Sequence, residues 1–200
     1  MRHNERGMGL MEVLVALLIL AIAILGFSAL QLQSVKATSE SVDRSQTLLL
    51  MRSFAERVRA NPSAIADYKT AFNSFEAGTL TEPTKLCQPT TNSNGLCTAS
   101  ELATADVWRL TRQLNATGLT MDLQPCPSTG GAGTNAATNV MYSYCLITAW
   151  GQTNPTIGSD TDPSDGSMDC LTPRDATDAN AIKSGGTYHP KATCMFMEVN

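Results

Sequence analysis

Glu12 lies at the start of a long apolar stretch, where a charged carboxylate is unfavourable unless it has a function. The unbroken apolar run 13–25 follows it, and the apolar segment continues to Leu30. This is about the length that crosses the hydrocarbon core of a bilayer. A carboxylate at the edge of lipid is costly unless a cation pairs with it, so we expect Glu12 to be functional. The simpler alternative is that its side chain only extends to the membrane surface.

The seven residues before the apolar segment carry Arg2 and Arg6 against a single acid, Glu5. By the positive-inside rule, the N-terminus stays in the cytoplasm and the rest of the chain crosses the membrane once. A cleaved secretory signal is the alternative, but its apolar centre has only about 7–15 residues. The longer run here, with Glu12 at its start, favours a retained membrane helix.

All six cysteines lie in the part of the chain that follows this helix: Cys87, Cys97, Cys126, Cys145, Cys170 and Cys194. An even number in a translocated segment indicates disulfides in an oxidising compartment. Six cysteines allow many pairings, and the sequence does not choose among them. Our first expectation is Cys87–Cys97, which encloses a turn-rich stretch, followed by Cys126–Cys145 and Cys170–Cys194 as local loops. A zinc site is disfavoured because no C-x-x-C pair exists.

Residues 158–169 place several carboxylates in one loop: Asp160, Asp162, Asp165 and Asp169. Calcium prefers such oxygen ligands. The spacing differs from that of an EF-hand, since Leu171 stands where the twelfth position, counted from Asp160, requires glutamate. We therefore interpret the segment as a solvated acidic loop, with calcium bound by Asp160, Asp162 and Asp165 as the less favoured alternative, and expect no other metal site.

Composition excludes several classes of function. The net charge is −4 and the chain has no basic stretch, so we expect no direct binding of nucleic acid. The only histidines are His3 and His189, and neither has the partners that a catalytic dyad or triad needs. We expect no cofactor and a chain that is the substrate of an enzyme, not itself an enzyme.

A single long helix is predicted to position Glu12. Residues 30–60 contain neither proline nor glycine, and an apolar stripe follows one face: Leu48, Met51, Ala55 and Val58. Pro62 predicts the end of the helix. The helix 8–61 would be roughly 80 Å long, with a membrane or filament half at about 8–33 and an amphipathic half at about 34–61.

The sequence around Glu12, Gly7 followed by MGLMEVLVALLI, resembles the type III signal of type IV pilins and type II secretion pseudopilins. The resemblance implies a seven-residue leader, which a prepilin peptidase cuts between Gly7 and Met8 before it N-methylates the Met8 amine. It also implies that Glu12 pairs with the Met8 amine of a neighbouring subunit and sets the register of assembly. A cut after Gly9 would leave Glu12 third instead of fifth in the mature chain, so the cut after Gly7 is preferred.

The head, 62–200, is rich in Thr, Ser, Asn and Gly. A helix is predicted at 100–114 with Thr98 and Glu101 as its capping box. Strands are predicted at 140–150 and 192–199 and near 119–123, and loops at 127–139 and 151–190. The predicted fold class is α+β and pilin-like, with a long N-terminal helix packed on a small antiparallel sheet and disulfide-stapled loops.

Within that family the chain looks most like the PilV-type minor pilins of type IV pili, through EVLVALLIL, LCTASELATADVWRL and YCLITAW. This implies a minor pilin that joins other minor and major pilins in a priming or tip complex, supporting motility, adhesion or DNA uptake. It would reside in the bacterial inner membrane with a periplasmic head, and then in the pilus at the cell surface. The alternatives are a type II secretion minor pseudopilin and a membrane-anchored periplasmic binding module with an uncut N-terminus.

Overall fold

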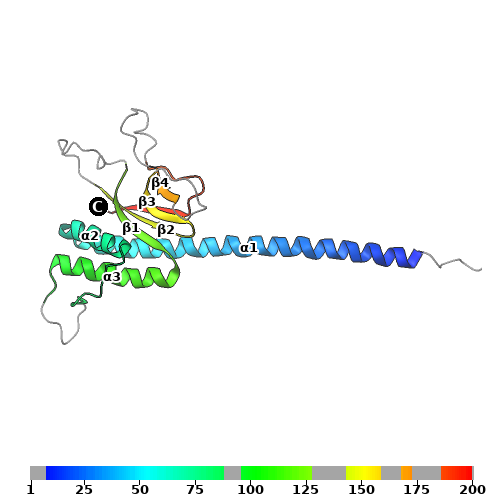
Figure 1. Ribbon diagram of the computed structural model, residues 1–200, viewed down its shortest axis with the longest axis horizontal. Helices are drawn as coiled ribbons and strands as arrows, with labels where there is room; N and C mark the ends of the chain where they lie inside the picture. Colours follow the sequence, from blue (N-terminus) through cyan, green and yellow to red (C-terminus); the bar gives the residue numbers. More distant parts are fainter. Residues whose placement is uncertain (1–7, 88–95, 128–142, 159–167, 173–185, 200) are drawn as a thin grey trace, which may run out of the picture. The chain divides into compact units, whose positions relative to one another are not determined.

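The computed structural model describes residues 8–87, 96–127, 143–158, 168–172 and 186–199 (Figure 1). The chain forms two compact units, residues 1–45 and 46–200. Helix α1, Met8–Ala60, begins in the first unit and ends in the second. Its start lies at the residue that the motif predicts as the new N-terminus, and its end lies one residue before the predicted end.

The last turns of α1 form part of the core of the 46–200 unit. Met51, Ala55 and Val58, three members of the predicted stripe, are buried together with Phe54. The Phe54 ring contacts Tyr68 and Phe72 edge-on, with centroid distances of 5.7 and 5.5 Å. The apolar stripe thus finds its partner within the head, as the amphipathic pattern requires.

Two short elements follow α1 that the sequence analysis did not predict. They are the 3₁₀ turn η1, Pro62–Ala64, and helix α2, Ile65–Glu76. Helix α2 buries Tyr68, Ala71 and Phe72 on one face. In Figure 1, α2 and α3 lie beside the C-terminal turns of α1.

Helix α3, Ala99–Thr117, confirms the helix predicted at 100–114 and extends it by three residues at its C-terminal end. The predicted capping box is present: the Thr98 hydroxyl accepts from the Glu101 N–H, and the Glu101 carboxylate accepts from the Thr98 N–H. Gly118 ends the helix with φ 70°, a left-handed conformation that favours glycine.

A three-stranded antiparallel sheet has the order β1-β2-β5. Its strands are β1, Thr120–Pro125, β2, Tyr144–Ala149, and β5, Cys194–Val199, each within or overlapping a predicted strand. Leu123, Leu146 and Met197 lie opposite one another across the sheet and contact the core that α1, α2 and α3 share. The long N-terminal helix, the small antiparallel sheet and the disulfides confirm the predicted α+β fold class.

The prediction of an unbroken loop at 151–190 was wrong at two places. Strands β3, Thr153–Ile157, and β4, Met168–Leu171, pair in parallel. Both are short, and Pro155 interrupts β3, so neither carries the alternating pattern that predicts a strand. Their position depends on long-range contacts, including the disulfide from Cys170 to Cys194 in β5.

Candidate functional site

The first candidate site is the N-terminal part of α1. Every described side chain from residue 9 to 39 is exposed, and no charged residue occurs between Glu12 and Lys36. The most apolar 18-residue window of this helix has a mean hydropathy of 3.0, and none of it is buried. By length and composition the helix is able to cross a membrane. An apolar surface of this extent requires either lipid or other helices to cover it.

Glu12 lies on the second turn of α1, and its side chain is exposed. Among the described residues no cation is hydrogen-bonded or ion-paired to its carboxylate. Met8 is the first residue of the helix, while Gly7 lies outside the described residues. The described chain therefore does not neutralise Glu12, and a cation for it has to come from elsewhere once lipid surrounds the helix.

Gly26 and Ser28 interrupt the larger apolar side chains of α1. The Ser28 hydroxyl donates to the Ile24 carbonyl oxygen at 2.8 Å, so this polar group is satisfied within the helix. No heavy atom lies within 4 Å of the position that a Cβ on Gly26 would take. Apart from Glu12, the apolar part thus carries no side chain that opposes burial in lipid or between helices.

Three disulfides join Cys87 to Cys97, Cys126 to Cys145, and Cys170 to Cys194. These are the three local pairs that the sequence analysis placed first. The last two belong to a second small core with Ile147, Ala149 and Leu171. The first links the segment after α2 to the start of α3, where Lys85 also pairs with Glu101 at 2.9 Å.

The acidic segment gives no metal centre in the part of the chain that the structure describes. Asp160, Asp162 and Asp165 lie outside the described residues. Asp169 lies in β4 and accepts a hydrogen bond of 2.5 Å from the Thr156 hydroxyl. His189 is buried, and its Nε2 lies 3.0 Å from the carbonyl oxygen of Gly158. Among the described residues no group of three or more metal-ligating side chains gathers.

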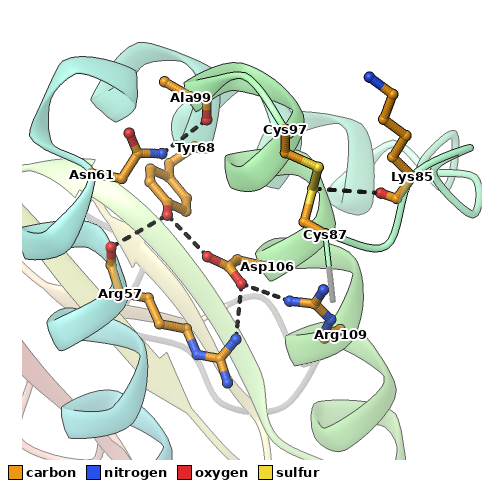
Figure 2. A network of polar contacts seen from close by, with 9 residues as sticks. All are labelled: Arg57, Asn61, Tyr68, Lys85, Cys87, Cys97, Ala99, Asp106 and Arg109. Atoms are coloured by element: carbon orange, nitrogen blue, oxygen red, sulfur yellow. Dashed lines mark hydrogen bonds and ion pairs between the residues drawn. A yellow bond between two sulfur atoms is a disulfide. The ribbon is translucent and has the colours of Figure 1, made fainter. Parts of the chain in front are cut away.

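A buried carboxylate, Asp106 in α3, joins three helices (Figure 2). Its Oδ1 accepts from Arg57 Nη1 in α1 at 2.8 Å and from Arg109 Nη1 in α3 at 3.0 Å. Its Oδ2 accepts from the Tyr68 hydroxyl in α2 at 3.2 Å. These partners compensate for the cost of burying the charge.

Tyr68 lies in the same polar cluster as Asp106. Burial and the neighbouring Asp106 carboxylate raise the pKa of Tyr68 to about 12. Its hydroxyl also lies 3.4 Å from the Arg57 carbonyl oxygen near the end of α1. At the same end, the Asn61 side chain donates to the Ala99 carbonyl oxygen at 2.8 Å. Polar contacts thus fix α2 and α3 to the last turn of α1.

A second buried carboxylate, Asp122 in β1, fixes the sheet to α2. Lys69 Nζ lies 2.9 and 3.1 Å from its two oxygens, and the Leu123 N–H and the Gln124 amide also donate to it. Partial desolvation and the Asp122 carboxylate raise the pKa of Glu76 nearby, although Lys69 opposes the effect. Neither carboxylate was identified from the sequence, because Arg57 and Tyr68, which contact Asp106, and Lys69, which contacts Asp122, lie far away in the chain.

Two family models match the chain. The model of the prokaryotic N-terminal methylation motif matches residues 2–28, and the Tt1218-like model, described as type IV pilin Tt1218, matches residues 29–108. No curated protein and no solved structure matches. The two matches adjoin and cover α1, α2 and about half of α3.

Together the matches support a type IV pilin that acts in pilus or pseudopilus assembly. The methylation motif implies processing by a prepilin peptidase and, in general, other pilins as partners. With the exposed apolar helix it also fits membrane anchoring followed by display on a pilus. The pilin family is structural rather than catalytic.

Proposed function

We propose that this type IV pilin is a PilV-type minor pilin, which takes part in a priming or tip complex with other minor pilins. Through the pilus it would support motility, adhesion or DNA uptake. The single observation that carries the proposal is the exposed, uncharged helix behind Glu12, matched by the methylation motif at residues 2–28. The three sequence stretches quoted above favour the PilV type. Since the net charge is −4, a role in DNA uptake would be indirect.

In this proposal the peptidase cuts between Gly7 and Met8 and methylates the new amine of Met8. Cleavage creates a cation where the chain had none. When helices pack in the filament, the Glu12 carboxylate and the Met8 amine of an adjacent subunit lie in the same low-dielectric layer. A subunit that enters out of register leaves both charges unpaired, so the pair selects the register.

The topology follows from the leader and the cysteines. Arg2 and Arg6 keep the leader in the cytoplasm, where the peptidase of this family cuts. The head reaches the periplasm, whose oxidising conditions allow the three disulfides to form. The subunit resides in the inner membrane before assembly and then enters the pilus.

Deletion of the chain in its native host tests the proposal. We expect fewer surface pili and weaker twitching, unchanged type II secretion, and recovery when the wild-type chain is restored. The full-length tagged chain should also appear in sheared pili, in much smaller amounts than the major pilin. Loss of type II secretion with normal pili would instead identify a minor pseudopilin. A chain that remains in the membrane fraction, while pili and secretion are normal, would identify an anchored binding module.

A further inference from the structure

A small pocket lies between the last part of α1 and α3, within the 46–200 unit. Its volume is about 60 Å³, and Phe54 forms part of its apolar wall. Arg57, Asp106 and Arg109 also line it, and Figure 2 shows these three side chains converging. Ser53 and Gln113, both exposed, contribute polar groups at its rim.

The charges at this pocket do not balance. One carboxylate oxygen of Asp106 is shared by two guanidinium groups, those of Arg57 and Arg109. Asp106 is only 4% exposed, whereas the Arg57 side chain is 45% exposed. The three groups together leave one positive charge in a partly buried place, although the whole chain is acidic. One further negative charge would neutralise it.

Arg109 still has hydrogen-bonding capacity. Its Nη1 binds Asp106, but Nε and Nη2 are buried and have no partner among the described residues. Nε–H and one Nη2–H point to the same side of a guanidinium, which is the arrangement that binds the two oxygens of a carboxylate. Leaving buried N–H groups unpaired is costly. Because Arg109 lines the pocket, a small shift of its side chain would bring Nε and Nη2 to a carboxylate placed there.

The size of the pocket limits what can enter it. A single water needs roughly 10–15 Å³ of such space, so 60 Å³ holds a group of a few heavy atoms. A carboxylate fits, and a nucleotide or a sugar acid does not. The carboxylate must therefore be presented on a chain that remains outside the pocket, which is the geometry of an aspartate or glutamate side chain.

We propose that this pocket accepts the carboxylate of an aspartate or glutamate side chain from a neighbouring pilin subunit. The inference rests on the proposed function, because only assembly places such a subunit against the head. Arg109 would bind the incoming carboxylate side-on, while Ser53 and Gln113 donate at the mouth. Asp106 would hold both arginines in place before the partner arrives.

An isosteric charge change tests the proposal in the native host. Gln113→Glu supplies a competing carboxylate at the rim, and Asn115→Asp makes the same amide-to-acid change two residues further along α3, on an exposed site outside the pocket. Because like charges brought together at an interface repel, we expect Gln113→Glu to lower incorporation into sheared pili by about tenfold or more. Asn115→Asp should incorporate like the wild type. Equal incorporation of both variants, or an equal loss, would overturn the proposal.

A photo-cross-linking residue in place of Ser53 identifies what reaches the pocket. In the full chain within pili, we expect an adduct to another pilin subunit, attached within a few residues of an Asp or Glu. Attachment only at sites remote from any acid would overturn the proposal and leave the pilin role standing. If the wild-type chain is absent from pili and gives no adduct with any pilin, both the proposed function and this inference fail.

Discussion

The hydroxyl of Tyr68 lies 3.2 Å from Oδ2 of Asp106, so a hydrogen bond to a buried carboxylate joins α2 to α3 beside their shared apolar core. The same carboxylate binds Arg57 of α1. The C-terminal end of α1 therefore lies in a polar cluster. An apolar contact would tolerate sliding, whereas these directed contacts define one position for each helix.

Tyr68→Phe removes this hydrogen bond and leaves the ring in place. We expect the free energy of unfolding of the head to fall by about 2 kcal/mol, because the acceptor is charged. Denaturant unfolding of the full chain in detergent, followed by Trp108 and Trp150 fluorescence, measures the change. Tyr144→Phe is the matched control, since no described residue hydrogen-bonds to that hydroxyl. Equal stability of the two variants would contradict the importance of the Asp106 contact.

The raised pKa of Tyr68 predicts a loss of stability in alkali. In the unfolded chain the tyrosine releases its proton near pH 10, but in the folded head it keeps the proton until about pH 12. The folded state then binds one more proton than the unfolded state, so stability is full below pH 10 and falls between these values by about 1.4 kcal/mol per pH unit. The wild type should show this extra slope and Tyr68→Phe should not. Parallel pH profiles of the two proteins would rule out the titration of Tyr68 as the cause.

The three disulfides should differ in their access to reductant. Cys87 and Cys97 are half-buried, whereas the other four cysteines are at most 9% exposed and lie in the second core. Mild reduction followed by alkylation and peptide mass mapping should therefore label Cys87 and Cys97 first. Earlier labelling of Cys126 and Cys145 would show that the sheet opens more easily than the segment before α3.

Glu12→Gln removes the charge from the apolar helix but keeps its shape. If the carboxylate pairs with the Met8 amine of a neighbour, the variant leaves that amine buried without a partner, at a cost of about 3 kcal/mol or more. We expect a strong loss of the chain from sheared pili while its N-terminus is still processed. Gln31→Ala, a change at an exposed uncharged site on the same helix, should assemble normally. Normal assembly of Glu12→Gln would disprove the register argument.

The predictable parts of this fold are those whose signal is local. Every residue of the uncharged run behind Glu12 suits the same apolar surroundings. Apolar composition and length alone therefore predict this helix. The Thr98–Glu101 capping box spans four residues and needs no tertiary contact. Helix α2 also had a local signal: Tyr68 and Phe72 lie four residues apart after Pro62, with Ala71 on the same face.

The long-range contacts could not be predicted from the sequence. Asp106 and Arg57 are separated by 49 residues, and Lys69 and Asp122 by 53. Nothing in the neighbourhood of either aspartate indicates that it is buried, because its burial depends on a cation that another element delivers. The parallel pair β3 and β4 is of the same kind, since each short strand depends on the other and on contacts with β2 and β5.

The N-terminal residue of the mature chain, determined by mass spectrometry on protein from its native host, distinguishes a processed pilin from an anchored or a secreted protein. Prepilin processing predicts a chain that begins at Met8 with an N-methylated amine. An intact Met1 would contradict it and leave an anchored protein outside any filament. A chain cut after the apolar run would also contradict it. Such a chain would lack the helix that enters the filament and would be a secreted domain.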